Sequence, residues 1–189
     1  MPRTLMWLLA GVLALGLGVI GSQWLPDPKN ARELRLTSMD GAPFDSAAAL
    51  AGKPYVVTFG YTFCPDICPT TLAYLAQVLD AQQAATGQRT QSVFVSVDPA
   101  RDTPERLTQY VAYFDPTTIA LTGSEAELKA AAQTFSVYFA KVDAVNGEDY
   151  LVDHSAGLLV LDADHQLIGL IRDGDALDDA LALLAKASP

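Results

Sequence analysis

Two cysteines, Cys64 and Cys68, are the most chemically capable side chains of the sequence, and they stand four positions apart. A disulfide between them would close so short a loop that it would stabilise the chain little. A structural disulfide is therefore the weaker alternative, and the pair is interpreted as functional thiols. A buried strand is predicted before them and a helix after them, and a helix N-terminus lowers the pKa of a nearby thiol. The thiolate is both a nucleophile and a metal ligand, so this position alone does not choose between the two.

Each cysteine is followed by a proline, in Cys64-Pro65 and Cys68-Pro69. The residue before a proline is disfavoured in helical conformation. We therefore predict a loop through both cysteines and a helix over residues 69–86. Such a loop can bring the sulfurs near each other while leaving them farther apart than the roughly 2 Å of a disulfide bond. This separation suits two ligands of one metal ion.

The remaining metal-binding residue types limit which ion fits. Two thiolates favour a soft ion such as Cu(I), zinc or an iron cluster. An iron–sulfur cluster normally requires four cysteines, and structural zinc requires four nitrogen or sulfur ligands. The chain has only two histidines, and His165 falls in a predicted hairpin turn, where it is interpreted as a solvated residue. Cys64, Cys68 and His154 remain, and this set fits copper better than structural zinc.

His154 lies in the segment Tyr150–Ser155 (YLVDHS), directly before a predicted strand. In an α/β sheet this loop would face the cysteines, although a surface or helix-capping histidine is the alternative. Asp153 is expected either to orient the imidazole ring, as carboxylates near metal sites do, or to be exposed.

A second carboxylate, Asp98, ends the predicted strand over residues 92–97. Functional side chains gather at the carboxyl ends of strands in open α/β sheets. Asp98 is therefore expected near the cysteines, as a supporting or docking carboxylate, with a turn residue before Pro99 as the alternative. Arg101-Asp102 is interpreted more simply as the start of a helix.

These residues are placed by an alternation of strands and helices. Such alternation predicts an α/β layer with helices on both faces of a sheet. The order is that of a thioredoxin-like fold, with an N-terminal extension and an inserted helix before the final hairpin. We expect strands at 33–37, 55–59, 92–97, 119–121, 138–142, 157–161 and 167–171, and helices at 69–86, 102–114, 124–135 (with a capping box of Ser124 and Glu127) and 175–187 (capped by Asp175).

The N-terminus carries an uncharged segment, Leu5–Ile20, after Arg3. About 20 apolar residues span a bilayer, and no A-x-A cleavage pattern follows the segment. We predict a membrane anchor over residues 1–25, in preference to a cleaved signal segment, then a linker over 26–32 and one domain over 33–189. Arg3 places the N-terminus in the cytoplasm, so a single-pass inner-membrane protein with a periplasmic domain is expected.

The charge balance excludes one large class of partners. The chain has 12 basic and 22 acidic residues, for a net charge of −10. A nucleic-acid-binding protein requires a basic surface, so no nucleic-acid partner is expected. The acidity is interpreted as a contribution to solubility.

Three motifs occur in order after the apolar segment: Phe59–Thr70 (FGYTFCPDICPT), Ser96–Thr103 (SVDPARDT) and Tyr150–Ser155 (YLVDHS). With them the sequence resembles the Sco/SenC proteins, the copper chaperones of cytochrome c oxidase assembly, from about Leu34 to Ala187. The resemblance implies a thioredoxin fold and a copper ion, Cu(I) or Cu(II) or both, held by Cys64, Cys68 and His154. It also implies that Asp98 influences the site.

The resemblance leaves two main functions open. One is delivery of copper to the CuA centre of a cytochrome c oxidase subunit, with a periplasmic copper donor as a further partner. The other is a thiol–disulfide reductase that keeps the CuA cysteines reduced through Cys64 and Cys68, which requires a thiol reductant. The C-x₃-C spacing, and His154-Ser155 where thioredoxins have a proline, argue against a general oxidoreductase. A peroxidase or redox sensor is a third hypothesis, from fold analogy alone.

Overall fold

A computed structural model describes residues 31–143 and 150–188 of the chain. The predicted anchor over 1–25 and most of the predicted linker lie outside the described residues. Within the described part, no helix has both the length and the apolar character needed to cross a bilayer.

The core of the domain is one mixed sheet of seven strands in the order β2-β1-β5-β4-β3-β8-β9. The neighbours β3, β4 and β5 are parallel, whereas β1, β8 and β9 join antiparallel. The carboxyl ends of β3 and β4 therefore share one edge of the sheet. The strand bounds are β1 Arg35–Ser38, β2 Pro43–Asp45, β3 Tyr55–Gly60, β4 Gln91–Ser96, β5 Ile119–Thr122, β8 Leu158–Leu161 and β9 Leu167–Ile171.

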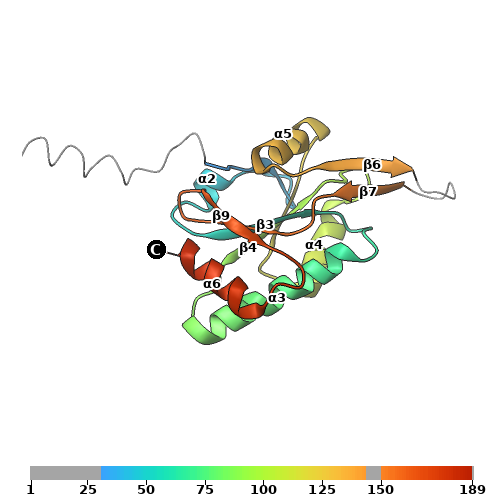
Figure 1. Ribbon diagram of the computed structural model, residues 1–189. Coiled ribbons are helices and arrows are strands. Elements are labelled where there is room, and N and C mark those ends of the chain that lie inside the picture. The colour runs from blue at the N-terminus through green and yellow to red at the C-terminus, as the bar shows by residue number, and fades with distance from the viewer. Residues whose placement is uncertain (1–30, 144–149, 189) are drawn as a thin grey trace, which may run out of the picture. The chain divides into compact units, whose positions relative to one another are not determined.

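Helices cover both faces of this sheet, which explains why every residue of β3 is buried. Figure 1 shows α5 on one face and α3 and α6 on the other. Apart from Cys68, the buried apolar side chains of α3 join those of α4 and α6 in one cluster, and Cys68 joins Leu128, Ala131 and Phe135 of α5 in the other. The predicted α/β thioredoxin-like architecture is confirmed. The helix bounds are α2 Ser46–Ala49, α3 Ile67–Thr86, α4 Pro104–Phe114, α5 Glu125–Phe135 and α6 Leu177–Ala187.

Helix ends follow the local sequence at two places and depart from it at a third. The capping box of Ser124 and Glu127 is present at the start of α5, and Gly87 ends α3 with a φ of 74°, which glycine adopts without strain. The predicted cap of α6 is wrong. Ala176 takes the N-cap position, and the Asp175 carboxylate instead accepts a hydrogen bond from Arg172 N at 2.7 Å.

The segment over 150–154 is a strand rather than the predicted loop. β7 (Tyr150–His154) pairs antiparallel with β6 (Phe139–Asp143), and the two form a small sheet of their own. Val152 is buried while Leu151 and Asp153 are exposed, so the strand presents alternate side chains to the domain. The strand could not be predicted from residues 150–154 alone, because its hydrogen bonds go to β6, which lies before the segment 144–149.

The start of α3 also differs from the prediction. The helix begins at Ile67, so Cys68 lies in its first turn instead of in the preceding loop. Proline is tolerated in the first turn because its missing N–H has no partner there. The bias against helix before a proline is a preference, and here the packing of Cys68 under the sheet edge outweighs it.

Candidate metal centre

The two sulfurs lie where β3 passes into α3, at the carboxyl edge of the sheet. Cys64 belongs to the connecting loop and Cys68 to the first turn of the helix. Both are free thiols and buried. The backbone N–H of Cys68 donates to Cys64 Sγ at 3.4 Å. The helix N-terminus therefore acts on Cys64 through a direct hydrogen bond.

His154, the last residue of β7, brings the third ligand atom. Its Nε2 lies 3.2 Å from Cys68 Sγ, and the imidazole nitrogen and both sulfurs all lie within 4.8 Å of one another. The other ring nitrogen, Nδ1, lies 3.1 Å from the carbonyl oxygen of Ser155. Tyr61 packs edge-on against the imidazole at 5.8 Å between ring centroids. The carbonyl and the tyrosine ring together fix which nitrogen faces the sulfurs.

A glycine makes room for the sulfur of Cys68. Gly60 ends β3, and a Cβ atom at this position would lie 2.8 Å from Cys68 Sγ and 3.0 Å from the Phe94 ring. Real Cβ atoms essentially never approach another atom to less than 3.0 Å, so the contact with the sulfur is too close. Cys68 can lie against the end of the strand only because this residue has no side chain.

The two thiols have very different pKa values. The hydrogen bond from Cys68 lowers the pKa of Cys64 to about 4, although burial acts in the opposite direction, and contacts with His154 and with the Cys68 backbone assist. The pKa of Cys68 is raised because its thiol bonds to Cys64 and is buried. Burial lowers the pKa of His154, but the nearby Cys64 sulfur and the Ser155 carbonyl outweigh it, and the net shift is upward. The metal-free site thus holds one thiolate beside an imidazole.

A hydrogen-bond network after β4 holds β7, the strand that ends in His154, in place. Asp98 is fully buried and accepts from Arg101 Nε at 2.5 Å and from the Tyr150 hydroxyl at 2.6 Å. Arg101 Nη1 also donates to the Tyr150 carbonyl at 2.9 Å, and its guanidinium lies 3.7 Å from the centre of that ring. Asp98 therefore reaches the site through the first residue of β7, rather than through contact with the cysteines.

Asp102 holds the cysteine loop, a role that the sequence analysis missed. Its buried carboxylate accepts from the backbone N–H and the hydroxyl of Thr62 and from the hydroxyl of Ser96. The helix-start interpretation is corrected, since Thr103 is the N-cap of α4. A clue was present in the sequence: two cap-type residues precede Pro104, and only one of them can cap the helix.

The remaining predicted residues lie apart from the sulfurs or face away. His165 is buried, not solvated as predicted, and its Nδ1 lies 2.8 Å from the hydroxyl of Tyr55 at the opposite end of β3. It therefore cannot join the ligand group. Asp153 is exposed, and the hydrogen bonds of the described residues tie the imidazole to Ser155 rather than to Asp153.

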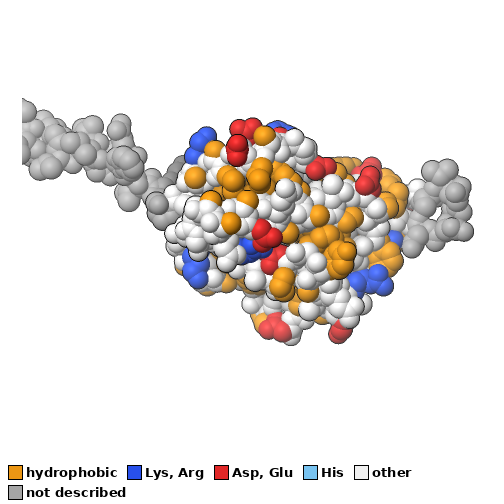
Figure 2. Space-filling view, turned by 90° about the horizontal axis from the view of Figure 1, so that it is seen from below, with side chains coloured by type: hydrophobic (Ala, Val, Ile, Leu, Met, Phe, Trp, Pro, Cys, Tyr) orange, Lys and Arg blue, Asp and Glu red, His pale blue; other side chains and the backbone are white. Residues whose placement is uncertain are grey.

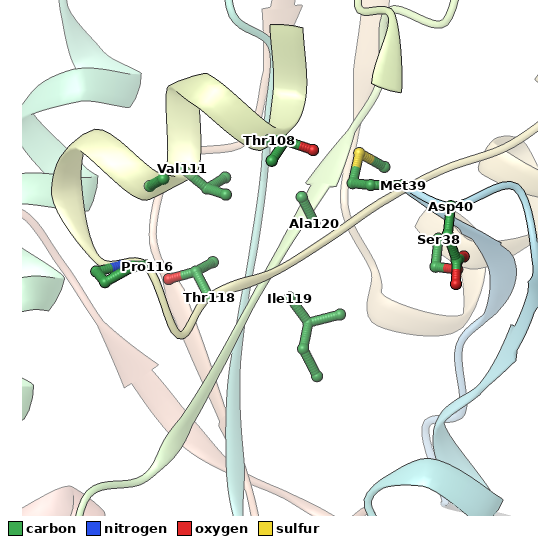
Figure 3. A pocket seen from close by; sticks show the side chains of 10 residues that line it. Ser38, Met39, Asp40, Thr108, Val111, Pro116, Thr118, Ile119 and Ala120 are labelled. Atoms are coloured by element: carbon green, nitrogen blue, oxygen red, sulfur yellow. The ribbon is translucent and has the colours of Figure 1, made fainter. Parts of the chain in front are cut away.

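A groove opens from the surface onto Cys64 and His154. It measures about 230 Å³, and its walls include Cys64, His154, Asp66 and Asp153. A second groove of about 350 Å³ lies between α4, β5 and the turn after β1 (Figure 3), but neither histidine nor cysteine lines it. On the face shown in Figure 2, lysine and arginine side chains are separated by acidic and uncharged ones. Of these two grooves, only the first is lined by soft-metal ligands, Cys64 and His154.

Comparison with known proteins decides the family. The family model SCO1/SenC matches residues 25–188. The chain belongs to the SCO1/SenC family. Among curated relatives of this SCO1/SenC chain, "Protein SCO1 homolog 1, mitochondrial" of Arabidopsis thaliana is 39% identical over 135 residues, covering 70% of the chain and 40% of the relative. A "Putative copper-binding protein" of Stutzerimonas stutzeri is 36% identical over 154 residues, covering 82% of the chain and 74% of the relative.

Solved structures agree with the family assignment. The crystal structure of Arabidopsis thaliana ScoI with copper bound superposes with a TM-score of 0.76 at 34% identity, covering 84% of this chain and 97% of that one. In the present SCO1/SenC chain, two reduced sulfurs and one imidazole nitrogen converge. Thiolate and imidazole donors are suited to copper, so the Cys64, Cys68 and His154 group is able to bind a copper ion.

Proposed function

We propose that the chain is a copper-binding metallochaperone that delivers copper to the CuA centre of cytochrome c oxidase during its assembly. One observation carries the proposal: the sulfurs of Cys64 and Cys68 and the imidazole of His154 lie within 4.8 Å of one another at a sheet edge. Two sulfurs and one nitrogen are too few for structural zinc and suit copper. Copper is here the cargo, which a partner takes up.

The position of the group supports transfer as well as binding. Cys64 and His154 border a groove of about 230 Å³ that is open to the surface, and a three-ligand set leaves a side from which an incoming thiolate can approach. We expect the partner's ligands to replace those of the chaperone one at a time, so that copper is never released as a free ion. Cys64 lies in a loop and His154 at the end of a strand, so these two ligands can leave with the least disturbance of the fold.

Metal analysis of the purified full chain tests the proposal. We expect the reduced chain, offered copper and zinc together, to retain one copper per chain, with an X-ray absorption edge typical of two sulfurs and one nitrogen. His154→Ala should remove tight binding, as should Cys64→Ala or Cys68→Ala. His165→Ala is the matched control, because it removes the other histidine at the opposite end of β3. Preference for zinc, or full copper affinity in His154→Ala, would reject the three-ligand site.

The proposal includes the location of the protein. The uncharged segment Leu5–Ile20 and the preceding Arg3 support a single-pass anchor in the inner membrane, with the domain in the periplasm. Alkaline extraction of membranes from cells that produce the full chain should leave it in the membrane fraction. Recovery of a soluble chain that starts after residue 20 would support cleavage instead.

A second candidate function is reduction of the CuA cysteines. The unlike thiols support it, because a low pKa at Cys64 and a raised pKa at Cys68 are typical of an attacking and a resolving thiol. His154→Ala separates the two functions. A reductase does not require the imidazole as a ligand, so oxidase assembly should survive the substitution if reduction is the main role, and should fail if copper transfer is.

A further inference from the structure

A buried carboxylate, that of Asp102, joins the loop that carries Cys64 to the end of β4. Asp102 is 2% exposed, and both of its oxygens are used. Oδ1 accepts from Thr62 Oγ1 at 2.6 Å, and Oδ2 accepts from Thr62 N at 3.0 Å and from Ser96 Oγ at 2.6 Å. Thr62 lies two residues before Cys64, and Ser96 ends β4. The carboxylate therefore joins the cysteine loop to the neighbouring strand.

Neither helix capping nor an ion pair explains why the Asp102 carboxylate is buried here. The cap of α4 is supplied by Thr103, whose hydroxyl accepts from Arg106 N at 3.3 Å. No ion pair of residues 31–143 and 150–188 includes Asp102. A buried carboxylate is costly unless it is fully hydrogen-bonded, so three donors on one buried carboxylate indicate that the arrangement depends on it.

Little else ties the loop to β4 close to Cys64. The N–H of Cys64 bonds within the loop, to the carbonyl of Tyr61 at 3.3 Å. The backbone bond from Val97 N to the carbonyl of Gly60 at 2.9 Å belongs to the strand before the loop. Without the carboxylate, the segment from Tyr61 to Cys64 would lose its bonds from Thr62 to the rest of the domain.

We propose that Asp102 is a positioning residue for copper binding, which holds the metal-free cysteine loop so that Cys64 stays within ligand distance of Cys68 and His154. The inference rests on the proposed copper binding and deepens it. Ordering ligands before the metal arrives removes a cost that binding would otherwise carry. Ser96 links this arrangement to the one at Asp98, since its hydroxyl accepts from Asp98 N at 3.2 Å. The two carboxylates nevertheless act on different segments, Asp102 on the cysteine loop and Asp98 on β7.

Asp115 provides a matched control within the same chain. It is likewise buried, at 5% exposure, and it accepts from the N–H and the hydroxyl of a threonine, Thr117, at 2.9 and 2.7 Å. It also pairs with Arg89 at 2.6 Å. Asp115 follows α4 and lies outside the ligand group, so Asp115→Ala should lower stability without changing the metal site.

The test compares Cu(I) affinity and thiol reactivity in the full chain. Cu(I) affinity is measured in competition with bicinchoninate. Asp102→Ala should lower it about ten- to hundredfold, the usual effect of removing a residue that supports metal ligands, and Asp115→Ala should leave it unchanged. In the metal-free chain, alkylation of Cys64 by iodoacetamide should be faster in Asp102→Ala than in wild type. Asp102→Asn, which keeps an acceptor oxygen, should lose less affinity than Asp102→Ala.

Each outcome decides a different point. Wild-type affinity in Asp102→Ala, or an equal loss in Asp115→Ala, would overturn the inference. If Asp102→Ala does not fold, Thr62→Val replaces it, since it removes one donor and keeps the side-chain shape; Thr62→Ser should then retain wild-type affinity. A wild-type chain that binds no copper would reject the proposed function instead, while the alkylation comparison would still test the role of Asp102.

Discussion

Gly60→Ala places one methyl group against the sulfur of a proposed copper ligand. The added Cβ would lie 2.8 Å from Cys68 Sγ and 3.0 Å from the Phe94 ring, whereas ordinary contact begins at 3.4 Å. The sulfur would have to retreat by about 0.6 Å, and metal–ligand distances tolerate only about 0.2 Å. Phe94 is buried and cannot turn aside, so the copper site itself should be distorted.

The expected losses follow from this geometry. Overpacking in a closed core costs about 1–3 kcal/mol, which for a domain of this size lowers the unfolding midpoint by about 2–12 °C. Copper affinity should fall about ten- to hundredfold, as for other changes that displace a ligand. Thermal unfolding of the metal-free chain measures the first effect, and competition with bicinchoninate for Cu(I) measures the second.

Gly169→Ala separates the sulfur displacement from the general effect of replacing a strand glycine. Its Cβ would meet Leu183 Cδ1 at 2.9 Å, but this side-chain end is flexible and only partly buried, so it can move away. Both variants gain the same advantage from a less flexible unfolded chain. Gly169→Ala should keep wild-type copper affinity. Equal affinities in Gly60→Ala and Gly169→Ala would refute the reasoning, whatever their stabilities.

Two further predictions concern the carboxylates. Tyr150→Phe deprives buried Asp98 of a 2.6 Å hydrogen bond and should cost about 1–3 kcal/mol in urea unfolding and weaken Cu(I) binding; wild-type affinity would show that the network does not position His154. Asp115→Asn should remove the contribution of Asp115 to the pH dependence of the unfolding free energy. Burial raises the pKa of Asp115, but hydrogen bonds from Thr117 and Arg89 outweigh it, and the net shift is downward. The stabilisation is therefore complete above the unfolded value near pH 4 and lost as the pH falls through the lower folded value, so urea unfolding should separate wild type from Asp115→Asn at pH 6 and show a narrower gap as the pH falls below 4. A gap that widens in acid would contradict the sign.

Spacing and chemical type within the sequence predicted the general fold and the position of the two cysteines, and the resemblance to the Sco/SenC proteins supported His154 as the residue that the structure brings beside them. Cys64 and Cys68 could be assigned to the end of a buried strand because YVVTF consists of β-branched and aromatic residues and a helix pattern follows. The capping box at Ser124 depends on residues three apart and was equally predictable. Such features depend on neighbours in the chain, so the sequence contains all the information that they require.

Long-range pairing decided what the sequence left open. His154 is on a strand because β6 pairs with it, and His165 is buried because a turn folds it onto Tyr55. Asp102 looked like a helix cap until the fold brought Thr62, forty residues earlier, within 2.6 Å. The type of a side chain determines which bonds it can form. Whether it forms them depends on which distant groups the folded chain brings near, and only the tertiary structure shows those groups.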